Sequence, residues 1–146
     1  MTPRQIELVR SSFAVVEPIA DAAATIFYCR LFDLDPSVRA LFATDMTAQR
    51  RMLMQTLAMV VRSLDRLEKV VPAVEALGRR HTGYGVRPGD FETVGTALLD
   101  TLEEALGPSF TIETRDAWAA AYGILASVMI GAGEQGATSG SEGAAA

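Results

Sequence analysis

Residues 90–106 read DFETVGTALLDTLEEAL, and this stretch decides the fold class. Its apolar residues recur at spacings of three and four: Phe91, Val94, Leu98, Leu102 and Leu106. This periodicity predicts a helix with one apolar face, because positions three and four apart lie on the same side of an α-helix. Asp90 can cap the start of that helix, and Gly107-Pro108 ends it.

Segments of the same kind lie on both sides of this helix. Their starts are marked by capping residues or prolines, at Thr2-Pro3, Asp35-Pro36, Thr47, Pro72 and Thr111. A further segment with an apolar face follows Glu17-Pro18 and ends at Asp33. No stretch alternates apolar and polar residues between hairpin turns, and no repeat recurs at a fixed period. The sequence therefore predicts an all-α protein with six to seven helices of uneven length.

The composition excludes several classes of protein. The chain has 146 residues, a length typical of one domain with a substantial core. A single Cys and a single His allow neither an internal disulfide nor a zinc or iron–sulfur site built from several such ligands. The net charge of −5 has the wrong sign for a protein that binds phosphate backbones without sequence preference, so we expect no nucleic-acid partner.

The two ends of the chain indicate its organisation. The N-terminus lacks the basic start and apolar core of a signal peptide, and charges interrupt every run before the roughly 20 apolar residues of a membrane span. We therefore expect a cytoplasmic protein without a membrane span. Residues 131–146 are rich in Gly, Ala and Ser and hold no large apolar residue, which predicts a flexible tail after a domain of residues 1–130.

The candidate chemistry centres on His81, the only histidine. It lies near the end of a helix with an apolar face, four residues after Leu77 and on the same side. The ordinary interpretation of such a residue is a buried imidazole bonded to a backbone carbonyl. Other segments favour a ligand site instead, because Tyr28 interrupts an apolar face with a hydroxyl and Gln49 stands one turn before Leu53. One imidazole with these partners suits a metal held mainly by a macrocycle, and haem is the obvious candidate.

Several motifs follow one another from the second predicted helix to the last. They are Ile26-Phe27-Tyr28 with Leu31-Phe32, residues 35–42 (DPSVRALF), Leu77-Gly78-Arg79-Arg80-His81, Tyr84-Gly85-Val86, and Ala117-Trp118 with Ala121-Tyr122-Gly123. In these motifs the chain resembles the globins, and among them bacterial single-domain globins similar to the globin part of flavohaemoglobins. The resemblance covers nearly all of residues 2–130 and implies the globin fold, a three-over-three helical sandwich.

The resemblance also implies roles for the candidate residues. His81 corresponds to the proximal axial ligand of the iron of haem b, and Phe42 to the aromatic ring packed against the porphyrin. Tyr28 and Gln49 take the distal polar positions, and Leu53 is the apolar gate one turn beyond Gln49. We expect the apolar walls of the pocket to include Leu57, Leu77, Val86, Phe91, Val94 and Leu98.

A distal Tyr and Gln imply tight binding of O₂, because a phenol and an amide can donate hydrogen bonds to a polarised ligand at low dielectric. We therefore expect reversible O₂ binding, with NO and CO as further ligands. NO dioxygenation with a separate reductase is the second expectation, because the chain is too short to hold flavin and nicotinamide domains. A haem-free or haem-based sensor module with the globin fold is the alternative, and the oligomeric state stays open between monomer and homodimer.

Two proximal positions depart from the flavohaemoglobin pattern. The family's proximal Tyr falls on Phe91, and its Glu falls near Gly133, with Glu134 one residue out of register. In the family, the Tyr and Glu side chains hydrogen-bond near the axial histidine and make it more basic. Their replacement predicts a weaker proximal push and argues against peroxidase-like activity.

Overall fold

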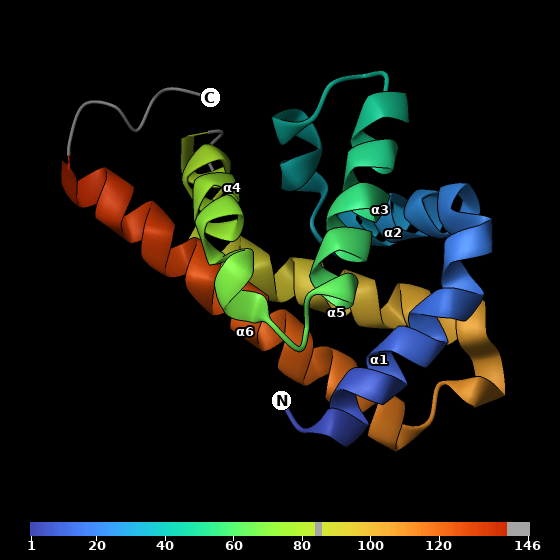
Figure 1. The fold of residues 1–146 in the computed structure, drawn as a ribbon. Helices are drawn as coiled ribbons and strands as arrows, with labels where there is room; N and C mark the ends of the chain where they lie inside the picture. Colours follow the sequence, from blue (N-terminus) through green and yellow to red (C-terminus); the bar gives the residue numbers. More distant parts are fainter. Residues whose placement is uncertain (84–85, 140–146) are drawn as a thin grey trace.

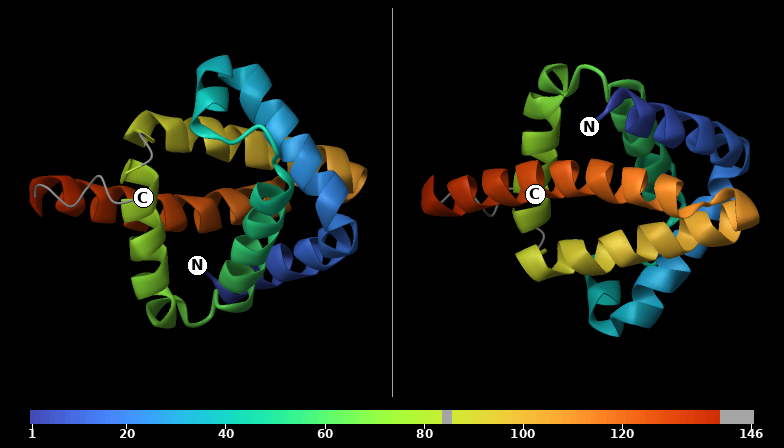
Figure 2. Two further views of the ribbon diagram at one scale, coloured as in Figure 1. Left: turned by 90° about the horizontal axis from the view of Figure 1, so that it is seen from above. Right: turned by 90° about the horizontal axis from the view of Figure 1, so that it is seen from below.

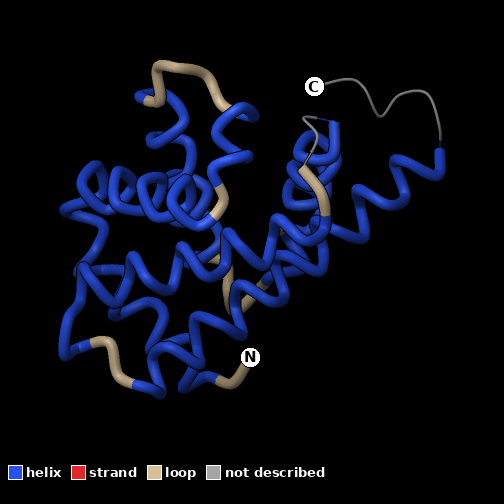
Figure 3. Tube along the Cα trace, turned by 180° about the vertical axis from the view of Figure 1, so that it is seen from behind, coloured by secondary structure: helices blue, strands red, loops and turns tan. Residues whose placement is uncertain are grey.

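The computed structural model describes residues 1–83 and 86–139, whose path is shown in Figure 1. Most of these residues lie in α-helices: α1 Pro3–Val16, α2 Ala20–Leu34, α3 Thr47–Arg62, α4 Val71–Gly83, α5 Pro88–Leu106 and α6 Ile112–Ser139. Short 3₁₀ helices join them: η1 Glu17–Ile19, η2 Pro36–Leu41, η3 Leu67–Lys69 and η4 Gly107–Ser109. The described residues contain no strand, so the all-α prediction is confirmed (Figure 3).

Short polar side chains start the first and last helices as the sequence predicts. The Thr2 hydroxyl accepts a hydrogen bond from Gln5 N at 3.1 Å, while the Gln5 side chain accepts one from Thr2 N at 3.0 Å. Pro3 occupies the first turn of α1, where its missing N–H costs nothing. The hydroxyl of Thr111, the residue before α6, accepts a hydrogen bond from Thr114 N at 3.1 Å. These local bonds satisfy backbone amides that have no partner inside the helix.

The starts of α3 and α5 differ from the prediction. Thr47 is the first residue of α3 rather than its cap, and its amide donates to Asp45 Oδ1 at 3.0 Å. Asp90 lies inside the first turn of α5 and accepts from Arg87 N at 2.8 Å. Both carboxylates lie near the positive end of a helix dipole, where a negative charge is stabilised.

The helices form two crossed layers. In the views of Figure 2, α5 and α6 run side by side, and α3 and α4 cross them. α2 packs against α5, α1 packs against α6 and α3, and α4 packs mainly against α6. The layer of α1, α3 and α4 therefore covers the layer of α2, α5 and α6, which is the predicted three-over-three sandwich.

The core is divided into two clusters of buried apolar side chains. The larger cluster, which includes Val9 and Phe27, lies among α1, α2, α3, α5 and α6. The smaller cluster is formed by α4, α5 and α6 and consists of Val74, Phe91, Ala126 and Met129. Tyr122 and Leu125 of α6 pack against both clusters. The buried residues of α4 belong to the smaller cluster, whereas those of α2 and α3 belong to the larger one.

The packing of α4 on α6 is closest at Gly78. A Cβ atom built on Gly78 would lie 2.6 Å from Met129 Cα, a distance at which the backbone of α6 would have to move. Gly78 is therefore required by the close approach of the two helices. His81 lies one turn further along α4, so the same contact sets its position over the smaller cluster.

Two helical stretches, Pro3–Leu34 and Ile112–Gly133, are long and apolar enough to cross a membrane by length and composition alone. The first is interrupted by η1 at Glu17–Ile19. Both stretches supply buried residues to the larger cluster, among them Phe13, Phe27 and Trp118. Packing within this fold therefore uses the apolar faces of both stretches.

The last helix continues beyond the boundary predicted at residue 130. α6 ends at Ser139, and Ala132 is only 2% exposed. Alanine favours helix and is small enough to pack closely, so the first part of the predicted tail is helical. Residues 140–146 lie outside the described residues, and a tail after α6 stays a prediction.

We expect Gly78→Ala to lower the free energy of unfolding by about 1–3 kcal/mol, because the added methyl group overlaps the Met129 backbone. Gly123→Ala in α6 is the matched control. Its Cβ would meet no atom within 4 Å, so alanine should stabilise the helix there by about 1 kcal/mol. Urea unfolding of both variants measures the difference. A Gly78→Ala protein as stable as the Gly123→Ala control would contradict the close contact.

Candidate functional site

Tyr28 of α2 and Gln49 of α3 meet through a hydrogen bond. Gln49 Nε2 donates to the Tyr28 hydroxyl oxygen at 3.1 Å. Burial raises the pKa of the Tyr28 phenol, and the bond from Gln49 opposes this rise only in part. The phenol therefore stays protonated at neutral pH. Because its oxygen is the acceptor in this bond, its own hydrogen can donate to a third group.

Three phenylalanine rings hold the Tyr28 ring in place. The Phe27 and Phe42 rings meet it edge-on, with centroids at 4.9 and 5.5 Å, and the Phe32 ring is tilted at 6.0 Å. These are the separations and orientations that aromatic pairs favour. The phenol is thus fixed toward Gln49, and the structure brings Phe42, the predicted porphyrin contact, beside the predicted distal tyrosine.

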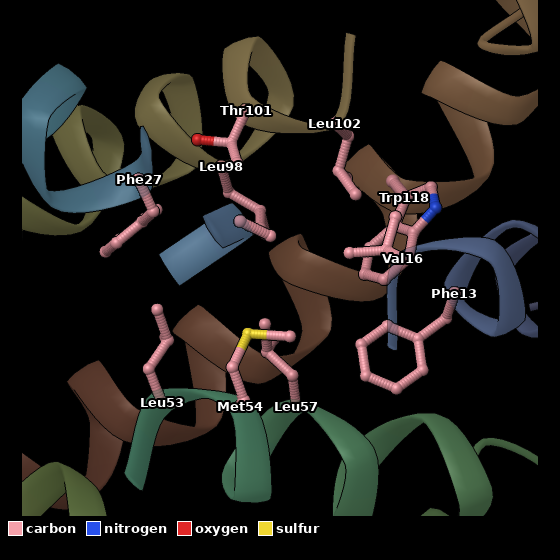
Figure 4. A pocket seen from close by; sticks show the side chains of 11 residues that line it. Phe13, Val16, Phe27, Leu53, Met54, Leu57, Leu98, Thr101, Leu102 and Trp118 are labelled. Carbon is pink, nitrogen blue, oxygen red and sulfur yellow. The ribbon is translucent and has the colours of Figure 1, made fainter. Parts of the chain in front are cut away.

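Leu53 and Leu57 of α3 line a small apolar cavity, together with Leu98 of α5 (Figure 4). The cavity has a volume of about 20 Å³, which is enough for one small molecule. Its one hydroxyl, on Thr101, already donates to Ala97 O at 2.7 Å. The cavity therefore offers water few hydrogen bonds and suits an apolar diatomic molecule better.

His81, the predicted axial ligand, is held in one orientation by its own helix. Its Nδ1 atom lies 2.7 Å from Leu77 O, and because a carbonyl only accepts, Nδ1 carries the hydrogen. Burial lowers the pKa of the imidazole, the bond to Leu77 opposes this in part, and the Arg80 charge lowers it further. The ring is therefore neutral, with a lone pair on Nε2 that a metal can accept.

Phe91 lies beside His81, and Tyr122 bonds to the Phe91 backbone. The Phe91 ring is 6.2 Å from the imidazole between centroids, and its backbone oxygen accepts a hydrogen bond from Tyr122 Oη at 2.6 Å. Burial raises the pKa of the Tyr122 phenol, so it stays a neutral donor. Its ring packs against Gly95, where a Cβ would lie 2.9 Å from Tyr122 Cε2. An apolar ring therefore stands beside the imidazole, and the Tyr122 phenol bonds to backbone instead.

The other predicted cofactor contacts are spread over the two core clusters. They pack against different clusters: Phe42, Leu53 and Val94 against the larger one, and Leu77 and Val86 against the smaller one. All of these side chains are only half-buried, whereas Phe91 is 8% exposed. A flat apolar group between the clusters would cover them, with His81 near the smaller cluster and Tyr28 in the larger. The residues present therefore fit haem.

The end of α4 and the end of α6 carry the remaining predicted positions. Val86 N donates to His81 O at 3.0 Å, which joins Val86 to the candidate ligand. Tyr84 and Gly85 lie outside the described residues, and so does the side chain of Glu134. Gly133, near which the family's proximal Glu is expected to fall, is buried in α6.

Sequence reasoning missed two residues that shape this region. Tyr122 could have been singled out, because a phenol on an apolar helix face needs a polar partner when buried. Arg39 of η2 donates to backbone oxygens of the segment that follows, beginning with Phe42 O at 3.2 Å. No sequence signal marks Arg39, because an arginine in a short polar stretch is ordinarily solvated.

Comparison with known families identifies the fold of this chain. The Globin family model matches residues 25–129, a range that contains Tyr28, Gln49 and His81. This chain belongs to the globin family. Among curated relatives, the globin is 31% identical to a flavohemoprotein of Vibrio cholerae over 135 residues, which are 89% of this chain and 34% of the relative. It is 33% identical to a flavohemoprotein of Bordetella parapertussis over 134 residues, 90% of this chain and 33% of the relative.

Solved structures share the fold of this globin. An engineered carbene transferase from Rhodothermus marinus, provisionally described as a nitric oxide dioxygenase, matches with a TM-score of 0.86 at 26% identity over 95% of this chain and 97% of its own. A bacterial globin from Campylobacter jejuni matches with a TM-score of 0.82 at 23% identity over 92% and 97%. The globin spans about a third of the length of the flavohemoproteins it matches.

We expect Tyr122→Phe to lower the free energy of unfolding by about 1 kcal/mol, because it removes a hydrogen bond to Phe91 O in a half-buried place. Thr96→Val in α5 is the control, since the Thr96 hydroxyl also bonds to a backbone oxygen, that of Glu92, but at an exposed position. Chemical unfolding measures how much each substitution lowers the free energy of unfolding. Equal losses in both variants would show that the Tyr122 bond contributes no more than an exposed one.

Proposed function

We propose that this globin binds haem b between α4 and the distal helices α2 and α3, and that it binds O₂ reversibly there. The observation that carries the proposal is a neutral His81 imidazole with Nε2 available, together with a Tyr28–Gln49 hydrogen bond in the neighbouring cluster. Similarity to flavohemoproteins supports it. When bound, the haem iron supplies the position at which a diatomic ligand is held.

His81 would hold the iron through Nε2. The hydrogen bond from Nδ1 to Leu77 O keeps the ring in one tautomer and one orientation, as the outer contacts of metal-bound histidines do. The chain has no second histidine. The other axial side therefore depends on Tyr28 and Gln49.

Tyr28 would donate the principal hydrogen bond to the distal ligand. Gln49 strengthens that donor, because a hydrogen bond accepted by the phenol oxygen polarises its O–H group. The surrounding rings of Phe27, Phe32 and Phe42 exclude water and fix the direction of the donor. This arrangement supports tight binding and slow release of O₂.

Leu53 would separate the distal position from the apolar cavity behind it. Leu53 and Leu57 line that cavity, whose walls are almost entirely apolar. An apolar wall favours O₂, NO or CO over water near the ligand position. Exclusion of water from this side would also slow oxidation of the bound complex.

A second candidate function is NO dioxygenation. It is favoured by similarity to the Rhodothermus marinus structure that is provisionally described as a nitric oxide dioxygenase. Formation of nitrate from NO and O₂ requires an electron, so turnover needs a reductant, and we propose a separate reductase. The resemblance places the family's proximal Tyr at Phe91, and we propose a weak proximal push without peroxidase-like activity. A cytoplasmic globin that is a monomer or homodimer is the accompanying proposal.

We expect protein produced with haem available to show a Soret band that shifts on reduction and on addition of CO. His81→Ala should lose the wild-type spectrum, because no other histidine can replace the ligand, and added imidazole should restore it. A wild-type protein without a Soret band would indicate the haem-free sensor alternative. An unchanged spectrum in His81→Ala would exclude His81 as the ligand.

We expect Tyr28→Phe to raise the O₂ dissociation rate about tenfold or more, as the loss of a hydrogen bond of about 1.5–3 kcal/mol would. Gln49→Leu should raise the rate less, because it removes only the bond that polarises the phenol. Stopped-flow exchange of O₂ for CO measures these rates. Cys29→Ser, at an exposed position next to Tyr28, is the control. A wild-type rate in Tyr28→Phe would contradict contact between the phenol and the ligand.

A further inference from the structure

Arg39 of η2 reaches across the segment that follows its own helix. Its Nη1 atom donates to Phe42 O at 3.2 Å and to Ala43 O at 3.0 Å, and its Nη2 atom donates to Thr44 O at 3.4 Å. One side chain therefore binds three successive backbone oxygens. The guanidinium carbon also lies 5.2 Å from the centroid of the Phe32 ring, within the range of a cation–π contact.

The segment that Arg39 binds has no regular structure of its own. It begins at Phe42, where η2 has ended, and runs to the start of α3 at Thr47. Its other described hydrogen bonds lie at the two ends: Phe42 N donates to Arg39 O at 3.2 Å, Asp45 Oδ1 accepts from Thr47 N at 3.0 Å, and Met46 O accepts from Arg50 N at 2.9 Å. Arg39 therefore supplies the hydrogen bonds to the middle of the segment.

This segment carries parts of the candidate site at both ends. Phe42 packs against the rings of Phe32 and Tyr28, at centroid distances of 5.6 and 5.5 Å. At the other end, α3 begins and presents Gln49 to the Tyr28 hydroxyl. A shift of the segment would move the ring expected to contact the porphyrin and the first turn of the distal helix together.

We propose that Arg39 is a positioning residue of the distal side, which holds Phe42 and the start of α3 at the depth required by the bound haem and by Tyr28. This inference rests on the proposed haem site. Arg39 acts through Phe42 and through the segment up to α3, and no contact of Arg39 with the cofactor is part of the inference. Stacking on Phe32 orients the planar guanidinium, so that its donors point along the row of backbone oxygens.

Arginine is suited to this position for a geometric reason. A guanidinium has five N–H groups in a fixed planar fork, so it can bond to several acceptors in a row. A lysine ammonium is a single charged point, and it can approach one or two of these oxygens without stacking on Phe32. Lysine should therefore preserve the charge and only part of the function.

The test uses the full-length protein loaded with haem. Arg39→Met keeps most of the apolar stem and removes all of the donors, and Arg39→Lys keeps the charge. The matched control is Arg30→Met, which removes one positive charge from α2, where Arg30 pairs with Glu104 at 3.2 Å. Three quantities are measured: the rate of haem transfer to a haem-scavenging apoprotein, the O₂ dissociation rate, and hydrogen exchange of the amides of residues 42–49.

We expect Arg39→Met to release haem about tenfold faster, the change that loss of a hydrogen bond from a charged donor produces. Its O₂ dissociation rate should rise as well, and exchange should accelerate in residues 42–49 more than in α5 or α6. Arg39→Lys should lie between this variant and the wild type, and Arg30→Met should match the wild type. If Arg39→Met does not fold, Arg39→Lys carries the same comparison.

Two results would overturn the inference. One is a wild-type rate of haem release and of O₂ dissociation in the Arg39 variants. The other is an equal acceleration in Arg30→Met, or a uniform rise in exchange over the whole chain, since either would reflect charge or general stability. Failure of the haem site itself has a different signature, because the wild-type protein would then not take up haem.

Discussion

The close contact of α4 with α6 is the constraint on which the rest of the site depends. At Gly78 the two backbones approach so closely that no side chain fits between them. Because α4 packs mainly on α6, it contributes to a small cluster of its own instead of joining α2 and α3. The core thus remains in two parts, with His81 beside one and Tyr28 inside the other. Half-buried apolar side chains pack against each part, and a flat apolar cofactor would cover such side chains.

Burial keeps the three principal titratable groups of the site neutral, each for the same physical reason. It raises the pKa of Tyr28 and of Tyr122 and lowers that of His81. Each group has a hydrogen-bond partner that sets its direction: Gln49 for Tyr28, Phe91 O for Tyr122, and Leu77 O for His81. The site therefore presents oriented dipoles without net charge. Such a lining suits a small polarisable ligand.

Polar residues at the ends of helices connect this site to the rest of the fold. Asp45 holds the start of α3 through Thr47 N, and Arg39 binds the segment before it. The predictions of Thr47 and Asp90 as caps were wrong by one residue and by three residues, and Asp45 and Asp90 each accept a hydrogen bond from an amide near the helix start. A carboxylate can accept from such an amide either from a position before the helix or from within its first turn. Only the folded backbone decides which of the two positions is used.

The roles of Tyr28, Gln49 and Phe42 are expectations from the resemblance to the globins, whereas the sequence pattern by itself determined the helices and the apolar face that carries His81. These features depend on the spacing of three and four residues, on capping side chains and on prolines, all of which act within one or two turns. Only the tertiary structure decided that Gln49 donates to Tyr28, that Tyr122 donates to Phe91 O across a separation of 31 residues, and that Arg39 spans the segment after η2. The first two bonds depend on how helices cross, and the third depends on the path of irregular backbone. Neither property follows from local periodicity, because crossing angles and loop paths arise from the packing of the whole core.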